Sequence, residues 1–216
     1  SATNQNDILF IYADDATAEG YFDNIDKTTR KGFDVGLKTA FEDWSVSMNY
    51  NYVKAQYGTD VTLISENNSS ADGEGAIEVK DGDYLPNIPK HSFKLRTVYQ
   101  PEPAWYLGAT MTAFSSSYMM GNENQENDSS VNGLQSEVPG YAIVNLDAEY
   151  NFSNTLKGWK IYAKVTNLLD NKYYTGGRIA ESRVEADRSF DDDEIATASL
   201  IGGAPRAGWV GLRYEF

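Results

Sequence analysis

Apolar and polar side chains alternate with a period of two along most of this chain. Between Trp44 and Tyr52 the even positions are apolar or aromatic, and the odd positions are Ser or Asn. Such a period places the two sets on opposite faces of one β-strand. The segment 33–41 follows the same pattern, and only Glu42 and Asp43 separate it from the next, which predicts a hairpin.

The alternation recurs often enough to fill the chain with strands. We predict an all-β, antiparallel protein with about eight of them, the first less regular than the rest, at 8–12, 33–41, 44–52, 93–100, 105–113, 142–152, 159–166 and 210–216. No segment shows a convincing helical period.

Short and long connections alternate between these strands. The short ones are 42–43, about 101–104 and about 153–158, and the long polar ones are about 13–19, 58–90, 119–140 and 171–205. All long loops are therefore expected at one end of the sheet. An up-and-down transmembrane β-barrel has short periplasmic turns and long extracellular loops, whereas a soluble sandwich mixes its loop lengths.

Aromatic residues gather where the short turns meet the strands. Trp44, Trp105 and Trp159 each begin a strand, while Phe41 and Phe152 end the preceding ones, all on the apolar side. Amphipathic rings prefer a membrane–water interface, so this row predicts a periplasmic aromatic girdle. The alternative is that the rings cap one end of a sandwich core.

The opposite, polar face carries charges that are expected to pair across strands. If the segments around 153–158 form a hairpin, Asp147 lies near Lys164, and Glu149 lies between Lys160 and Lys164. Opposite charges across strands are mildly favourable. We interpret this face as a wet, salt-bridged wall without a catalytic role.

Composition excludes several functions. The 216 residues carry a net charge of −14, which argues against nucleic-acid binding. With no Cys and His91 as the one His, thiolate or histidine metal sites and Ser–His relays are not expected. We predict no enzyme, no cofactor and no metal site; the acidic run 191–194 lacks EF-hand spacing, which favours a solvated loop over a Ca²⁺ site. No apolar run is long enough for a transmembrane helix, which leaves transmembrane strands open.

Two sets of segments resemble known membrane proteins. Val210, Leu212, Tyr214 and the final Phe216 resemble the assembly signal of bacterial outer-membrane proteins, in which the barrel-assembly machinery recognises the last strand. In order along the chain, NIDKTTRKGFDV (24–35), PNIPKH (86–91), PGY (139–141), VTNLLDNKYY (165–174) and GAPR (203–206) resemble segments of TonB-dependent outer-membrane receptors. Each is weak alone, but their order and spacing make the resemblance specific.

The resemblance implies a location and a role. Members of this family have a 22-stranded barrel filled by an N-terminal plug that carries the TonB-contacting box. With about eight strands and neither plug nor box, residues 1–216 are expected to be the C-terminal part of such a barrel. The resemblance implies TonB-dependent uptake of a scarce nutrient, most often a ferric siderophore, across the bacterial outer membrane. The implied partners are the lipid bilayer, the barrel-assembly machinery, a small-molecule ligand, and the TonB complex through the plug.

Residues for ligand contact are candidates only in the last long loop. They are Tyr173, Tyr174, Arg178 and Arg183, for which ordinary loop packing is the alternative. Two other interpretations of the whole chain stay open: an autonomous eight-stranded outer-membrane barrel, and a soluble β-sandwich binding module.

Overall fold

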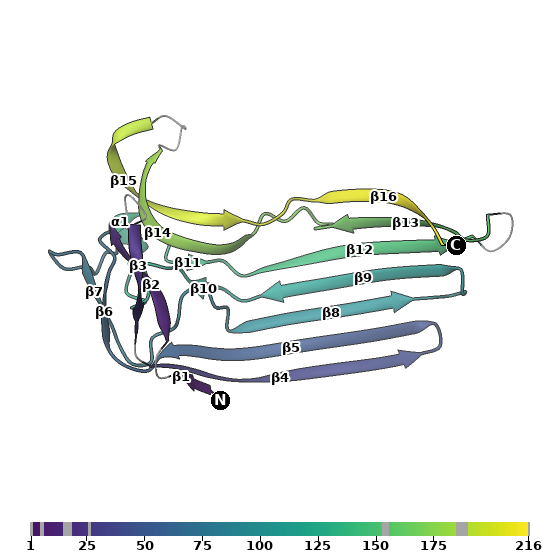
Figure 1. The fold of residues 1–216 in the computed structure, drawn as a ribbon, viewed down its shortest axis with the longest axis horizontal. Helices are drawn as coiled ribbons and strands as arrows, with labels where there is room; N and C mark the ends of the chain where they lie inside the picture. The colour runs from purple at the N-terminus through teal and green to yellow at the C-terminus, as the bar shows by residue number, and fades with distance from the viewer. Residues whose placement is uncertain are drawn as a thin grey trace.

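The computed structural model describes residues 2–4, 7–14, 19–25, 27–152, 156–184 and 190–215, with side chains described outside 8–24 and 182–195. Its main element is one eight-stranded antiparallel sheet (Figure 1). In spatial order the strands are β1 (Ala2–Asn4), β4 (Thr28–Phe41), β5 (Trp44–Tyr57), β8 (His91–Tyr99), β9 (Trp105–Phe114), β12 (Tyr141–Asn151), β13 (Trp159–Thr166) and β16 (Ala207–Tyr214). The predicted all-β, antiparallel, up-and-down architecture is confirmed.

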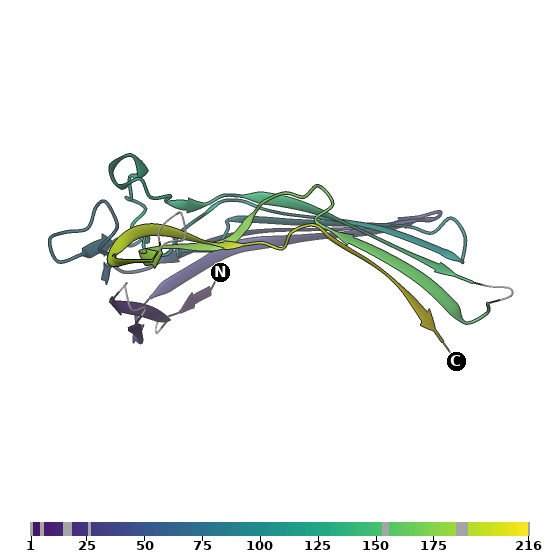
Figure 2. The ribbon, with the colours of Figure 1, turned by 90° about the horizontal axis from the view of Figure 1, so that it is seen from above.

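This sheet is a single curved layer, as Figure 2 shows from above. In the described part of the chain, β1 and β16 are its two edges and do not pair with each other. A β-sandwich needs a second sheet packed face to face on the first, and an autonomous eight-stranded barrel needs its edges joined. The arrangement matches neither alternative and fits a segment of a larger barrel wall.

The long connections contain small hairpins of their own. These are β2 (Ile8–Asp14) with β3 (Glu19–Asn24), β6 (Val61–Ile64) with β7 (Ala76–Val79), β10 (Ser117–Tyr118) with β11 (Glu137–Val138), and β14 (Tyr174–Val184) with β15 (Phe190–Gly202). All of them lie at one end of the sheet, on the left of Figure 1, and the short connections lie at the other. The predicted alternation of short and long connections is therefore correct from 42–43 to 171–205, whereas the predicted long connection 13–19 lies inside the β2–β3 hairpin.

Helix is almost absent from the described residues. The single helix α1 (Ser129–Asn132) lies in the connection between β10 and β11, and the Asp128 side chain caps it by accepting a hydrogen bond from the Ser130 amide. Among the residues that the structure describes, no helix has the length and apolar character needed to cross a bilayer.

One predicted strand is in the wrong place. Segment 8–12 was expected to be the first strand of the main sheet, but it belongs to β2, which pairs only with β3 in a separate hairpin. The edge position is taken by β1, whose three residues pair with the start of β4. The pattern of 8–12 is apolar enough for a strand, but it does not select a partner, and the nearby β3 offers the shorter loop closure.

The buried core lies among the loops and not in the sheet. Seven buried apolar residues form it: Ile25, Ala55, Tyr57, Leu63, Ile77, Val79 and Leu85. Two come from the loop end of β5 and four from the connection 58–90, while Ile25 lies between β3 and β4. By contrast, Phe33, Leu37 and Val210 on the main sheet are 55%, 52% and 69% exposed. The sheet thus presents a large apolar surface that nothing in the described residues covers, which a soluble domain avoids.

Candidate functional site

The strand register joins the apolar positions into one continuous surface, called here the apolar face. Across the sheet, Leu37 lies opposite Met48, Met48 opposite Leu95, and Leu95 opposite Met111. The same matching continues from Val144, opposite Met111, to the far edge. Between the two aromatic rows described next, the apolar face carries no charged residue: its positions are 35, 37, 39, 46, 48, 93, 95, 97, 107, 109, 111, 113, 142, 144, 146, 148, 161, 163, 165, 208, 210 and 212.

The lower aromatic row runs along the short-turn end of the apolar face. Trp44, Trp105 and Trp159 are the first residues of β5, β9 and β13, and each is about 40% exposed. Phe41 ends β4 opposite Trp44, and the Phe152 amide donates a hydrogen bond to the Trp159 carbonyl oxygen. The structure therefore brings together, in one row, the five residues predicted as a girdle. That this row lies at a membrane interface stays a prediction.

Cross-strand partners lengthen this row beyond the predicted set. The Tyr99 ring stacks on Trp44 with centroids 4.5 Å apart, Tyr150 lies 4.6 Å from Trp105, and Tyr214 lies 5.2 Å from Trp159. Sequence reasoning did not assign these three tyrosines to the girdle. They share its parity, and each lies near the short-turn end of its strand, which is the signal that would have found them.

An upper aromatic row lies at the loop end of the same face. Phe33 lies 5.6 Å from Tyr52, which lies 5.2 Å from His91, and the Tyr50 hydroxyl is 2.7 Å from the His91 Nδ1. From Trp44 to Tyr52 the strand rises about 27 Å at about 3.4 Å per residue. With a strand tilt of about 40°, the rows are about 21 Å apart along the membrane normal, close to the roughly 25 Å apolar band of outer-membrane barrels.

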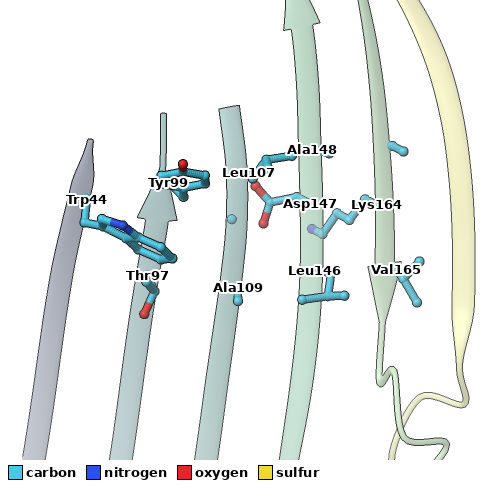
Figure 3. Close-up of a pocket in the computed structure, with 12 residues that line it drawn as sticks. Trp44, Thr97, Tyr99, Leu107, Ala109, Leu146, Asp147, Ala148, Lys164 and Val165 are labelled. Atoms are coloured by element: carbon cyan, nitrogen blue, oxygen red, sulfur yellow. The ribbon is translucent and has the colours of Figure 1, made fainter. Parts of the chain in front are cut away.

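The apolar face has a shallow hollow of about 390 Å³ near the lower row. Small side chains form its floor at Thr97, Ala109 and Ala148, and Trp44 and Tyr99 stand beside it (Figure 3). The lining is mostly apolar, and Asp147 and Lys164, which belong to the polar face, also take part in it. The hollow is part of the apolar face, and we assign it no catalytic role.

The polar face is held by an ion pair that crosses one whole strand. Arg96 on β8 donates from both terminal nitrogens to Asp147 on β12, over distances of 2.6 and 2.7 Å, and also to the Thr110 and Tyr106 hydroxyls. The guanidinium passes over Gly108 of the intervening β9, where a Cβ would clash with its nitrogens. Gly108 therefore makes room for the pair.

The predicted charge partners on this face are only partly correct. Asp147 and Lys164 are backbone neighbours as expected, but the Asp147 carboxylate binds Arg96 instead. Lys160 lies 3.8 Å from Glu149, as anticipated, and 2.9 Å from Glu215 on β16. Sequence alone gave no register between β8 and β12, which are two strands apart, so the arginine partner was missed.

The long loops interlock into one body at the loop end. Asn68 and Ser65 in the connection 58–90 donate hydrogen bonds to the carbonyl oxygen of Gly121 in the connection 119–140, each over 2.8 Å. The connection 171–205 joins them through Gly177. Its amide donates to Asn87 Oδ1 over 2.9 Å, and its carbonyl oxygen accepts from the Met120 amide. Beside its apolar core, this body contains buried amide side chains, which include Asn68, Asn122, Asn124 and Asn127.

The segment 165–174 acts as a turn that fixes the base of the last loop. Asn167 is buried in a left-handed conformation; its Nδ2 donates to the carbonyls of Asn171 and Ala204, and its Oδ1 accepts from the Asn171 amide. Asp170 accepts from the Arg206 amide over 3.2 Å. The two segments 165–174 and 203–206 therefore meet in space and have an architectural role.

The ligand-contact candidates are only partly described, and their role stays a prediction. The Tyr173 ring lies 4.6 Å from the Tyr141 ring, which lies 5.2 Å from the Phe114 ring, both pairs being tilted, whereas Tyr174 and Arg178 follow along β14. The Arg183 side chain lies outside the described residues, as do the side chains of 191–194. Among the residues that the structure describes, no group of three His, Cys, Asp or Glu could hold a metal ion.

The predicted assembly signal is only partly described. Val210, Leu212 and Tyr214 lie on the apolar face of the edge strand β16, 69%, 64% and 45% exposed, and Phe216 lies outside the described residues. An exposed edge strand with this face is available for pairing. Its recognition by an assembly machinery stays a prediction.

Comparison with known proteins agrees with this geometry. Residues 2–168 match the family model described as TonB dependent receptor-like, beta-barrel. The chain is 25% identical over 166 residues to a probable TonB-dependent siderophore receptor, PiuA, of Acinetobacter baumannii, covering 76% of this chain and 20% of that protein. It is 30% identical over 162 residues to the metal-pseudopaline receptor CntO of Pseudomonas aeruginosa, covering 74% and 19%.

A solved structure shows the same fold. The crystal structure of PiuA from Acinetobacter baumannii superposes with a TM-score of 0.63 at 19% identity, over 98% of this chain and 24% of that one. The chain spans about a fifth of the length of the curated relatives it matches. It belongs to the TonB-dependent receptor β-barrel family, a family of transport receptors. The resemblance drawn from its sequence motifs is confirmed.

Proposed function

We propose that this chain is the C-terminal part of the barrel wall of a bacterial outer-membrane receptor that imports a metal chelate, with a ferric siderophore as the first candidate. The observation that carries the proposal is the apolar face. It is uncharged between two aromatic rows whose spacing fits a bilayer, and all long loops lie beyond one of those rows. Soluble binding modules have no use for such a surface.

The orientation follows from the loops. The apolar face contacts lipid, the polar face lines the lumen, and the interlocked loops face the outside of the cell. Docking of a plug in the lumen, contact of that plug with TonB, and recognition of β16 by the barrel-assembly machinery belong to the same proposal.

The ligand class is supported by two relatives. One is named as a siderophore receptor and one as a metal-pseudopaline receptor, so a metal chelate is the common chemistry. At the loop end of the sheet, Tyr173 with Tyr141 and Phe114 offers an aromatic cluster that an aromatic or apolar chelate would contact. Tyr174, Arg178 and Arg183 are further candidates along β14, the arginines for an anionic chelate.

Uptake by intact cells tests this function. Deleting the gene should reduce the uptake of radioactive iron, supplied as chelates recovered from the bacterium's own iron-limited culture medium, to the level of de-energised cells. Cobalamin uptake serves as the control and should not change. Unchanged iron uptake together with lost cobalamin or copper uptake would refute the siderophore assignment, and a protein absent from the outer-membrane fraction would refute the receptor.

A further inference from the structure

Lys90 carries a positive charge at the loop end of the polar face. One step beyond the pair of Tyr52 and His91, the Val53 amide donates a hydrogen bond to the Lys90 carbonyl oxygen over 3.0 Å. Lys90 therefore lies on the same side as Ser92, which is the polar side of the sheet. No carboxylate among the described side chains comes within 4.0 Å of the Lys90 Nζ, so this charge is not neutralised by an ion pair.

Two tyrosine rings hold the Lys90 ammonium group in place. Its Nζ lies 3.7 Å from the centre of the Tyr84 ring and 5.9 Å from that of the Tyr118 ring, and the two rings stack 6.1 Å apart. A cation is attracted to the faces of aromatic rings. The ammonium group is therefore fixed before a ligand arrives, which reduces the cost of ordering it on binding.

A hollow of about 230 Å³ lies beside this ammonium group, and its lining includes Lys90, Ser116, Ser117 and Glu137. Within the described part of the chain, the hydroxyls of Ser116 and Ser117 make no hydrogen bond. Pockets that enclose a whole small ligand measure roughly 300–1,000 Å³. This hollow is smaller, so it has room for one arm of a larger ligand.

The chemistry of the hollow favours a carboxylate over an aromatic arm. Hydroxyl and ammonium donors match the two acceptor oxygens of an ionised carboxylate, and a charged donor strengthens the hydrogen bond. An aromatic arm gains less, because Lys90 already covers one face of the Tyr84 ring. The Glu137 carboxylate opposes an anion, but it makes no ion pair with Lys90 and leaves the ammonium group available.

We infer that Lys90, together with Ser116 and Ser117, binds a carboxylate arm of the imported metal chelate. Phe114, which belongs to the aromatic cluster proposed above to contact the chelate, lies opposite Ser92, two residues after Lys90 on the same side of the sheet. One chelate can therefore place its body on the aromatic cluster and a carboxylate arm in the hollow. This inference rests on the proposed function, because it takes the polar face as the wall along which the chelate passes.

Chelate binding by the complete receptor tests the inference. The receptor is purified in a neutral detergent, and its apparent affinity is measured for the radioactive iron chelates recovered from the bacterium's iron-limited medium. Lys90→Gln should weaken binding roughly 10- to 100-fold, the usual effect of losing a hydrogen bond to a charged group. Lys90→Arg keeps the charge and should retain most of the affinity.

Lys94→Gln is the matched control, because Lys94 lies on the same face of β8 and does not line the hollow. It is about 14 Å from Lys90 at about 3.4 Å per residue, which exceeds the Debye length of about 8 Å. The change removes the same charge and should leave the affinity within about twofold. Equal losses in Lys90→Gln and Lys94→Gln would overturn the inference, since the charge of the whole wall would then attract the chelate.

Glu137→Gln gives an independent test, because it removes the negative charge from the wall of the hollow. It should strengthen chelate binding by up to about fivefold, the upper range for a solvent-accessible charge pair. Weaker binding would indicate that Glu137 attracts a cationic arm, and it would overturn the carboxylate assignment.

Covalent coupling identifies the arm directly. A water-soluble carbodiimide joins a carboxylate to a lysine amine as an amide; it takes up the water that is lost and leaves as a urea. In the Glu137→Gln receptor, which cannot form an internal amide at that position, mass spectrometry of peptides should find the chelate attached to Lys90. Bound chelate with Lys90 unmodified would overturn the assignment in favour of a phenolate or hydroxamate arm.

The outcomes separate this site from the proposed function. Unchanged binding and import in Lys90→Gln would overturn the site alone, whereas a receptor that binds none of these chelates would overturn the proposed function as well. A heat-modifiable electrophoretic mobility equal to that of the wild type verifies that Lys90→Gln folds. If it does not fold, the affinity of Glu137→Gln and the coupling to Lys90 decide the question.

Discussion

Gly108 is the position where one methyl group should disconnect a cross-strand ion pair. In Gly108→Ala the new Cβ occupies the place of the Arg96 guanidinium, so the arginine must leave Asp147. The backbone itself tolerates alanine, because Gly108 is not among the residues with positive φ. The expected effect therefore comes from the lost pair and not from strain in β9.

The magnitude follows from the burial of the pair. The Arg96 and Asp147 side chains are 23% and 27% exposed, so their interaction is only partly screened. Hydrogen bonds to charged groups contribute about 1.5–3 kcal/mol, and replacing Gly by Ala returns about 0.4–1 kcal/mol through the unfolded chain. We expect Gly108→Ala to lower the free energy of unfolding by about 1–2 kcal/mol.

The assay is denaturant unfolding of the receptor in lipid vesicles, followed by tryptophan fluorescence. Gly36→Ala is the matched control, because Gly36 lies on the polar face of β4 and a Cβ there meets only Asn49 at an ordinary 3.5 Å. It should be neutral or slightly stabilising. Equal effects of the two substitutions would refute the reasoning, as would an undiminished effect of Gly108→Ala in an Arg96→Gln background.

Three further predictions address the two faces and the loops. Leu146→Arg, in the middle of the apolar face, should destabilise the protein in a bilayer by about 2–4 kcal/mol, whereas Asn145→Arg on the polar face should cost far less; equal losses in vesicle unfolding would contradict the assigned faces. Asn68→Ala should leave buried partners unpaired and cost about 1–3 kcal/mol, visible as faster proteolysis in 58–90 and 119–140; unchanged cleavage would show that the loops do not depend on it. The backbone amides of Ala76 and Glu74 donate hydrogen bonds to the Asp72 carboxylate and lower the pKa of Asp72 below 3.8. The ionised carboxylate therefore stabilises this turn above pH 3.8, and that stabilisation is lost as the pH falls below it. Hydrogen exchange of the Ala76 amide should accelerate there, and an Asp72→Asn variant should lack this pH dependence.

The apolar pattern predicted the wall of the sheet well because its physical cause is local. A period of two sets the face of each residue, and a short turn such as Glu42-Asp43 sets the register of the strands that it joins. Trp44, Trp105 and Trp159 could therefore be placed in one row without a structure. The partner of each strand across a short turn followed directly.

Features that depend on non-adjacent strands could not be predicted in the same way. The Arg96–Asp147 pair depends on the registers of β8, β9 and β12 together and on the missing side chain at Gly108. The pairing of 8–12 was missed because alternation identifies a strand but not its neighbour. The loop body is stabilised by amide side chains such as Asn68, whose polar sequence is equally typical of an unstructured loop.

Site-specific labelling of β12 tests the central claim, that one face of this sheet contacts lipid and the other lines a lumen. These 216 residues contain no Cys, so single cysteines placed one at a time from 143 to 149, in a complete receptor from which any other cysteine has been removed, report on their own position. Spin labels on the even positions should collide with oxygen dissolved in the bilayer, and labels on the odd positions with a water-soluble nickel chelate. Lipid accessibility with a period of two, highest at the even positions, is the predicted result. Equal water accessibility of both sets would contradict the account.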